Sequence, residues 1–257
     1  MKSILRGSLA LMIAAALILP AAAYERVAVS LNGRETALDA RLIGDTTYVP
    51  LDESTKLLGE AIGTDIAVEA IPEEICVSAR GRYIGGSENL ELDGIVFVPV
   101  RSIAKIFCAE VGWNDNRSVE LTAYENSGIT PGDEFYIADE VEWLSRIIYA
   151  EAGIEPFAGK VLVGNVVLNR VRSDEFPDTI YDVIFDRKFG VQFTPTVNGM
   201  IWRTPSAACV TAAKLCLDGF SLSDKAMYFL DPDIATNFWI TDNRPFLFKV
   251  GGHAFYE

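Results

Sequence analysis

The pattern of hydrophobic and polar positions divides the chain into a strand-rich first part and a helix-rich second part. In residues 24–124, apolar side chains come in short runs bounded by turn-forming residues, which predicts short strands. In residues 139–257, they recur at intervals of three and four, which predicts helices with one buried face. Residues 125–138 are polar and contain two glycines and one proline, so we expect a linker there. The predicted fold class is therefore α+β.

Two segments of the first part repeat one pattern, in which a β run and a proline precede a helical stretch. The run at 47–51 precedes a helical pattern at 54–58, and the run at 96–100 precedes a second one at 102–107. Each unit has an apolar face that only a neighbour can cover. We therefore predict a two-fold α+β module over residues 24–124.

Helical spacing in the second part is clearest at residues 143–152. Leu144, Ile147 and Ile148 lie at positions i, i+3 and i+4, and Glu151 follows at i+7. Burial without a charge partner raises the pKa of a carboxyl, so Glu151 is a candidate general acid. The alternative is that the helix ends there and Glu151 simply reaches solvent.

The remaining apolar patterns predict further helices and short β pieces in residues 139–257. Residues 157–172 are apolar nearly all round, which is typical of a buried helix, and Asn165 and Asn169 lie on its one polar stripe. The long connection at 186–204 is of a length that is usually functional or mobile. Shorter helices are expected at 180–185 and 205–217, and β pieces at 227–230, 238–240 and 246–248.

The N-terminus has the three parts of a secretory signal peptide. Lys2 and Arg6 are followed by an apolar run at 9–19 and by three alanines at 21–23. We expect removal of residues 1–23 and a secreted protein. No later stretch is apolar over the roughly 20 residues that a membrane-spanning helix needs.

The chain carries a net charge of −14, which disfavours nucleic acid and anionic surfaces as partners. Its ligand should be neutral, cationic or recognised by shape. Metal and cofactor chemistry is not expected, because His253 is the only histidine and no phosphate-binding glycine loop is present.

The four cysteines leave two questions open. A Cys76–Cys108 disulfide is compatible with the sequence, whereas Cys209 and Cys216 lie about 10 Å apart along one predicted helix and cannot bridge there. A nucleophilic pair of one of these two thiols with His253 stays open as a minor alternative. Otherwise the second part offers carboxylates with aromatic and amide side chains, which suits a carbohydrate ligand.

The motifs TYVPL and DGIVFVPVRSIAKIF in the first part resemble the copper amine oxidase N-terminal-like domain, a stalk module of secreted bacterial proteins. Copper binding is not implied here, since residues 24–124 contain no histidine. The resemblance implies a spacer or adhesion module, with a cell-wall or protein partner.

Several ordered motifs of the second part closely resemble the SleB/CwlJ-type cell-wall hydrolases. The resemblance implies a lysozyme-like helical fold and cleavage of peptidoglycan glycan strands, between N-acetylmuramic acid and N-acetylglucosamine, in the cell wall or the spore cortex. The characterised type is a lytic transglycosylase, and the glutamate of its Ala-Glu-Ala motif, here Glu151, is the catalytic acid. The motifs are WLSRIIYAEAGIEPFAGKVLVGNVVLNRVRSDEFPDTIYDVIF, then QF, AMYFLDP, NFW and GGHAFYE.

Other site residues follow less directly. Glu155 is the obvious second carboxyl, but Gly153 and Pro156 break the helix between the two glutamates, so a capping role for Glu155 is favoured. Two other functions remain open: a muramidase that uses water, and a non-catalytic wall-binding or adhesion protein. Substrate contacts are predicted for Gln192, Phe193, Asn169, Tyr228 and Trp239, and a structural or cleft-edge place for His253.

Overall fold

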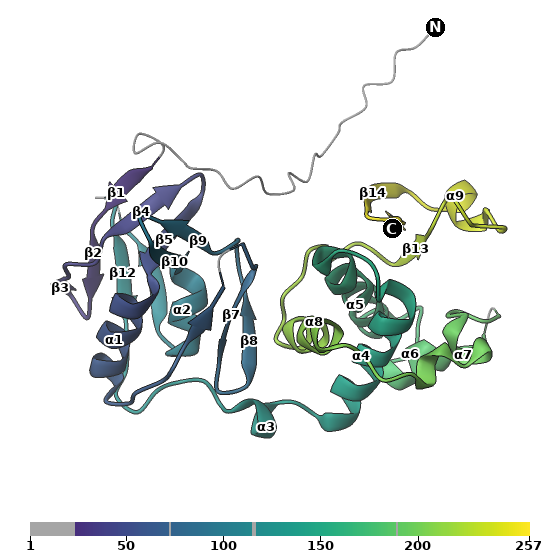
Figure 1. Ribbon diagram of the computed structural model, residues 1–257, viewed down its shortest axis with the longest axis horizontal. Coiled ribbons are helices and arrows are strands. Elements are labelled where there is room, and N and C mark those ends of the chain that lie inside the picture. The colour runs from purple at the N-terminus through teal and green to yellow at the C-terminus, as the bar shows by residue number, and fades with distance from the viewer. Residues whose placement is uncertain (1–23, 72, 115–116, 189) are drawn as a thin grey trace, which may run out of the picture.

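The computed structural model describes residues 24–71, 73–114, 117–188 and 190–257. Two bodies lie next to each other, a strand-rich N-terminal module and a mainly helical C-terminal domain (Figure 1). This arrangement confirms the predicted α+β class. The expected signal peptide, residues 1–23, lies outside the described residues. None of the described helices is long and apolar enough to cross a membrane.

The N-terminal module is built on a five-stranded antiparallel sheet. From edge to edge its strands are β1 (Glu25–Val27), β4 (Ala40–Ile43), β5 (Thr46–Pro50), β10 (Ile95–Pro99) and β9 (Leu90–Leu92). Helices α1 (Leu51–Ile62) and α2 (Val100–Ile106) directly follow the two central strands. Both helices begin after a proline, which ends the strand and fixes an extended backbone at the helix cap.

The two β-proline-helix units are related by an approximate two-fold axis. Their strands β5 and β10 are antiparallel neighbours, with Val49 opposite Val98 and with each strand's proline near the other strand's aromatic residue. The strands β4 and β9 pair antiparallel with β5 and β10, so these four strands are arranged symmetrically about the β5–β10 pair, and β1 extends the sheet on the β4 side only. The predicted two-fold module is confirmed.

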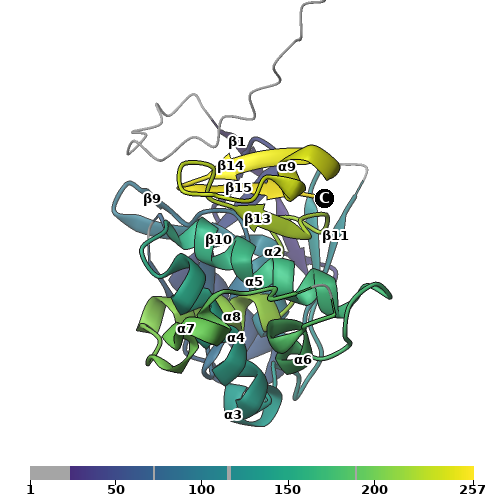
Figure 2. The same cartoon turned by 90° about the vertical axis from the view of Figure 1, so that its right-hand side faces the viewer.

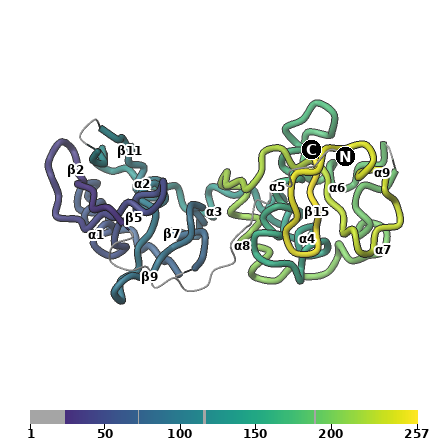
Figure 3. Tube along the Cα trace, turned by 90° about the horizontal axis from the view of Figure 1, so that it is seen from above, coloured from purple at the N-terminus to yellow at the C-terminus, as the bar shows by residue number. Residues whose placement is uncertain are grey.

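Two smaller sheets complete the module. One contains β11 (Glu110–Trp113), β12 (Val119–Thr122), β2 (Val29–Leu31) and β3 (Arg34–Glu35), and the other contains β6 (Glu69–Ala70), β7 (Cys76–Ala79) and β8 (Arg82–Gly85). Strand β11 of the first sheet packs against α2. The β7–β8 hairpin of the second sheet lies on the side of the module that faces the C-terminal domain (Figure 3).

The C-terminal domain packs its helices around α5 (Phe157–Val171). Every residue of this helix from 159 to 170 is buried, as its all-round apolar pattern predicts. The domain also has a three-stranded sheet, which lies above α5 in the view of Figure 2. The other elements are α4 (Ala138–Ala152), α6 (Ile180–Phe185), α7 (Pro195–Asn198), the 3-10 helix η1 (Met200–Trp202), α8 (Ala207–Leu217), α9 (Trp239–Asn243), and strands β13 (Tyr228–Leu230), β15 (His253–Tyr256) and β14 (Phe246–Val250).

One predicted β piece, 238–240, is wrong, because residues 239–243 form helix α9. Short polar side chains explain the change, since they bond to nearby backbone and favour a turn over a ladder. Asn237 accepts a hydrogen bond from the Trp239 N–H at 2.9 Å, and Asn243 donates to the Trp239 carbonyl at 2.8 Å.

The segment expected as a linker is packed against both bodies. Ile129 is buried in the core of the N-terminal module, and α3 (Gly132–Phe135) follows it. The Tyr136 hydroxyl then donates to the carboxylate of Asp218 in the C-terminal domain. The domain boundaries themselves stay a prediction.

A buried carboxylate joins the two bodies. Asp218 follows α8 and accepts two hydrogen bonds of 2.8 Å from the guanidinium of Arg82 on β8, and Lys105 of α2 lies 3.0 Å from it. Next to this pair, the ring of Phe220 lies so close to Gly85 that a Cβ there would fall 2.2 Å from it. A side chain at position 85 would therefore separate the two bodies.

Candidate active site around Glu151

Glu151 lies in the last turn of α4, on the helix face that points into the core. Leu144, Ile147 and Ile148 of this face are fully buried, and Glu151 at its end is half-buried. Burial raises the pKa of the Glu151 carboxyl from its ordinary value to about 7. The negative end of the helix dipole acts in the same direction. Among the described residues, no hydrogen bond or ion pair engages this carboxyl.

This environment suits a group that gives a proton and later takes one back. A carboxyl with a pKa near 7 is present in both forms at neutral pH, so it can act as general acid in one step and as general base in the next. Glu151 thus has the position and the acidity that the apolar stripe predicts, and its catalytic role is taken up below as a proposal.

Glu155 is held by the C-terminal hairpin instead of capping the next helix. The predicted capping role is wrong, because α5 has Pro156 at its cap position and no side-chain capping bond. The Glu155 carboxylate accepts a hydrogen bond of 2.9 Å from the Gly252 N–H, in the turn between β14 and β15. Proline at the cap leaves the glutamate side chain free to reach this turn.

The hairpin turn is shaped for this carboxylate. Gly251 has a φ of +57°, and a Cβ on it would fall 1.8 Å from the nearer carboxylate oxygen of Glu155. Glycine is therefore required at position 251 both by its backbone and by the approach of Glu155. The contact fastens the α4–α5 turn, which directly follows Glu151, to the sheet.

The two asparagines of α5 hold the chain that follows α8. Asn165 donates to the Phe220 carbonyl at 3.0 Å and accepts from the Leu222 N–H at 2.8 Å. Asn169 is 6% exposed and donates to the carbonyls of Ser223 and Ala226, both at 2.9 Å. Asn165 is therefore a core polar group whose hydrogen bonds are made inside the domain. The structure gives Asn169 the same role, and its substrate contact stays a prediction.

A buried cation, Arg170, organises the predicted Gln-Phe motif. Arg170 is 4% exposed and has no carboxylate within salt-bridge distance among the described residues. It donates to the Met227 carbonyl at 2.8 Å, and burial lowers the pKa of its guanidinium to about 10. Gln192 accepts a long bond of 3.5 Å from it, and Phe193, at 2% exposure, packs under it in the core.

Sequence reasoning missed Arg170, although a signal exists. A charged residue inside a helix that is apolar on all sides must be buried, and it then needs local partners. Here those partners are the Met227 carbonyl, the Gln192 side chain and the faces of three aromatic rings, which belong to Phe176, Phe193 and Tyr228.

Tyr228 and Trp239 lie together at the edge of the β13 sheet. The Tyr228 hydroxyl accepts a hydrogen bond of 2.8 Å from Arg244, whose guanidinium lies over both rings, 4.6 Å from Tyr228 and 5.6 Å from Trp239. Trp239 is 51% exposed. This pair presents an aromatic surface of the kind that sugar rings stack on. The substrate contacts of Tyr228 and Trp239 stay a prediction.

His253 and the thiols are placed unfavourably for catalysis. His253 is buried against Phe229, its Nδ1 has no partner among the described residues, and burial lowers its pKa. Cys209 and Cys216 are buried in α8, and burial raises the pKa of the Cys216 thiol to about 12, so a thiolate is disfavoured. All four cysteines are free thiols, and the Cys76–Cys108 bridge is not formed.

The C-terminal half of the chain is similar to known proteins. The family model described as Cell Wall Hydrolase matches residues 154–256, a range that begins just after Glu151. A spore cortex-lytic enzyme of Oceanobacillus iheyensis is 35% identical over 134 residues, which cover 51% of this chain and 47% of that protein. One of Bacillus subtilis strain 168 is 34% identical over 119 residues, or 46% and 38% of the two chains.

A solved structure also matches this half. The catalytic domain of the germination-specific lytic transglycosylase SleB from Bacillus anthracis is 33% identical, with a TM-score of 0.43, and the match covers 50% of this chain and all of that one. The chain spans less than half the length of the curated relatives given above. Residues 154–256 are thus a cell-wall hydrolase domain, and the resemblance to the SleB-type hydrolases is confirmed for this half of the chain.

Proposed function

We propose that this protein cleaves the glycan strand of peptidoglycan, with Glu151 as its single catalytic acid and base. The observation that carries the proposal is the Glu151 carboxyl, which is half-buried at the end of α4, has no partner among the described residues and has a pKa of about 7. The family of the matched domain supports the cell wall as the substrate, and the names of the relatives support lysis of its glycan strands.

The proposed reaction is a lytic transglycosylation between N-acetylmuramic acid and N-acetylglucosamine. Protonated Glu151 gives its proton to the glycosidic oxygen as the bond from that oxygen to C1 of the muramyl sugar breaks, and the sugar's N-acetyl group stabilises the cationic C1. The Glu151 carboxylate then takes the proton of the O6 hydroxyl while O6 bonds to C1. A 1,6-anhydro ring forms, Glu151 is protonated again and no water is consumed.

The surroundings of Glu151 favour this route over an ordinary glycosidase mechanism. A hydrolase of that kind needs a second carboxylate, about 5 Å away for retention or about 6.5–9.5 Å away for inversion of the anomeric configuration. The nearest glutamate along the chain, Glu155, is already bonded to the backbone of Gly252. A transglycosylase needs only one carboxyl, because the substrate supplies its own nucleophile.

Product analysis separates the two enzyme mechanisms. Purified peptidoglycan digested by the protein should yield 1,6-anhydromuramyl ends in mass spectrometry. Reducing ends, heavier by one water, would instead establish the hydrolytic muramidase. Absence of any released muropeptide from every wall preparation would favour the non-catalytic wall-binding protein.

The place of action belongs to the same proposal. The relatives named above are spore cortex-lytic enzymes, so we propose that the protein is secreted and acts on the cell wall or the spore cortex. Digestion of vegetative walls and of isolated cortex in parallel tests which polymer is preferred.

A further inference from the structure

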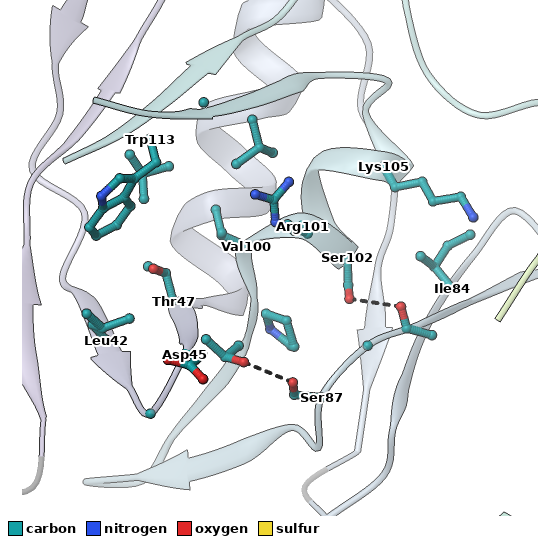
Figure 4. Close-up of a pocket in the computed structure, with 18 residues that line it drawn as sticks. Leu42, Asp45, Thr47, Ile84, Ser87, Val100, Arg101, Ser102, Lys105 and Trp113 are labelled. Carbon is teal, nitrogen blue, oxygen red and sulfur yellow. Dashed lines mark hydrogen bonds between the residues drawn. The ribbon is translucent and has the colours of Figure 1, made fainter. Parts of the chain in front are cut away.

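The N-terminal module contains a cavity of about 620 Å³ (Figure 4), and all of its lining residues belong to this module. It opens where four segments meet: the β4–β5 turn, the β8–β9 connection, the start of α2 and the β11–β12 ribbon. Its size is within the usual range of small-ligand sites, roughly 300–1,000 Å³. Nothing in the proposed chemistry of the C-terminal domain uses it.

One wall of the cavity is aromatic. Trp113, at the end of β11, is 47% exposed and lies beside Leu42 and Thr47 in Figure 4. An indole that is half-exposed over a concave surface offers a flat face on which a pyranose ring can stack.

Hydroxyl groups line another part of the cavity, which we call its floor, and they belong to Thr46, Ser87 and Ser102. The Thr46 and Ser87 hydroxyls lie 3.0 Å apart, and the Ser102 hydroxyl donates to the Gly85 carbonyl at 3.3 Å. Each of these oxygens keeps capacity for a further hydrogen bond. Gly86 allows this close packing, since a Cβ there would fall 2.3 Å from the Ser102 oxygen.

One cation in the cavity is free to bind a ligand. Arg101 is exposed and has no hydrogen bond or ion pair among the described residues. The second cation, Lys105, is already paired with Asp218 at 3.0 Å. A single available guanidinium suits one carboxylate of a ligand.

We propose that this cavity is a second glycan-binding site, which takes a carboxylate-bearing amino-sugar segment of peptidoglycan. A sugar ring stacks on Trp113, the ligand's hydroxyl and amide groups bond to the floor, and Arg101 binds its carboxylate. The choice of polymer rests on the proposed function, whereas the presence of a saccharide site rests on the cavity alone.

The cavity is fixed relative to the catalytic domain. Gly85 and Lys105 line it and also contact Phe220 and Asp218 across the interface between the two bodies. A strand held in the cavity would therefore keep the catalytic domain close to the same polymer. This would raise the effective concentration of substrate at Glu151.

Binding to insoluble peptidoglycan tests the proposal without turnover. The full chain carrying Glu151→Gln serves as parent, and Trp113→Ala and Arg101→Ala are added to it singly. We expect each to weaken binding about tenfold in sedimentation assays, which corresponds to one lost stacking or charged contact. Titration with soluble N-acetylglucosaminyl-N-acetylmuramic acid should quench the tryptophan fluorescence of the parent. In the Trp113→Ala variant, the part of this quenching that comes from Trp113 should be absent.

Two matched variants outside the cavity serve as controls. Tyr124→Ala removes an exposed aromatic ring of the same module, and Arg34→Ala removes an exposed cation. Both should bind like the parent. Unchanged binding of the Trp113 and Arg101 variants, or equal losses in the controls, would overturn the cavity proposal. Failure of the proposed function would appear separately, as absence of muropeptide release by the protein with Glu151 intact.

Discussion

At the scale of single residues, the acidity of Glu151 follows from the helix that carries it. The apolar stripe of Leu144, Ile147 and Ile148 buries one face of α4, and the Glu151 carboxyl takes the next position on the same face. The sequence alone predicts this placement, because helical spacing is local. It does not predict the absence of a partner for Glu151, or the carboxylate contact of Glu155 with Gly252, because both depend on segments far away in the chain.

The first prediction concerns the pH dependence of lysis. Glu151 must be protonated to act as the acid, and its pKa is raised to about 7, so activity should fall as pH rises through 7. The decline should approach tenfold per pH unit well above that value. Turbidity loss of peptidoglycan suspensions, measured from pH 5 to 9, gives the profile.

Glu155→Gln is the matched variant for this profile. It keeps Glu151, so the decline above pH 7 should persist in whatever activity remains. A decline that disappears in this variant would assign the titrating group to Glu155 instead.

The second prediction concerns stability. A carboxyl with a raised folded-state pKa destabilises the fold once the unfolded chain is ionised, so the penalty begins near pH 4.5, grows up to about 7 and then stays constant. Glu151→Gln removes it and should raise the free energy of unfolding at pH 8 by on the order of 2 kcal/mol. At pH 4 the gain should vanish. Denaturant titrations at both pH values check this, and a loss of stability at pH 8 would contradict the burial argument.

At the scale of elements, the α4–α5 turn and the β14–β15 hairpin form one unit through Glu155. Most helices here could be predicted from periodicity, and α5 and α6 lie within one residue of their expected bounds. The error at 238–240 arose because side-chain bonds to the backbone outweigh a three-residue apolar run. The contact of Glu155 with the β14–β15 turn could not be predicted, because Glu155 and Gly252 are 97 residues apart in the sequence.

The third prediction tests that contact. Gly251→Ala places a methyl group against the Glu155 carboxylate and strains a positive φ, so the free energy of unfolding should fall by about 2–4 kcal/mol. Gly199→Ala is the control, since its φ is +82° and no atom lies within 4 Å of an added Cβ. It should cost only about 1 kcal/mol. Equal losses in thermal unfolding would mean that backbone strain alone matters at position 251.

At the scale of the whole molecule, Asp218 holds the two bodies together. The composition of residues 125–138 predicts a linker between the two bodies. It does not predict their interface, because the residues that form it, Arg82, Lys105 and Asp218, are far apart in the sequence. Burial alone opposes ionisation of Asp218, yet the hydrogen bonds from Arg82 and Lys105 hold its pKa below the ordinary value. The interface should therefore be stable at neutral pH and weaken only as acid protonates this carboxyl.

The fourth prediction concerns this interface. Asp218→Asn leaves the buried guanidinium of Arg82 without its charge partner and should cost about 3–5 kcal/mol. Limited proteolysis within residues 125–138 should become faster. Asp233→Asn is the control, because Asp233 forms an exposed ion pair with Lys249 at 3.7 Å that should contribute less than about 1 kcal/mol. Unchanged proteolysis in the Asp218 variant would show that the bodies are held by other contacts.

Release of muropeptides from purified peptidoglycan, compared between the native protein and Glu151→Gln, is the most direct test of the whole account. Circular dichroism and sedimentation with peptidoglycan confirm that the variant folds and still binds. The native protein should release anhydromuropeptides, and the variant should be slower by about a thousandfold or more, since both proton transfers depend on this carboxyl. Equal release by the two proteins would contradict the assignment of Glu151 as the catalytic acid.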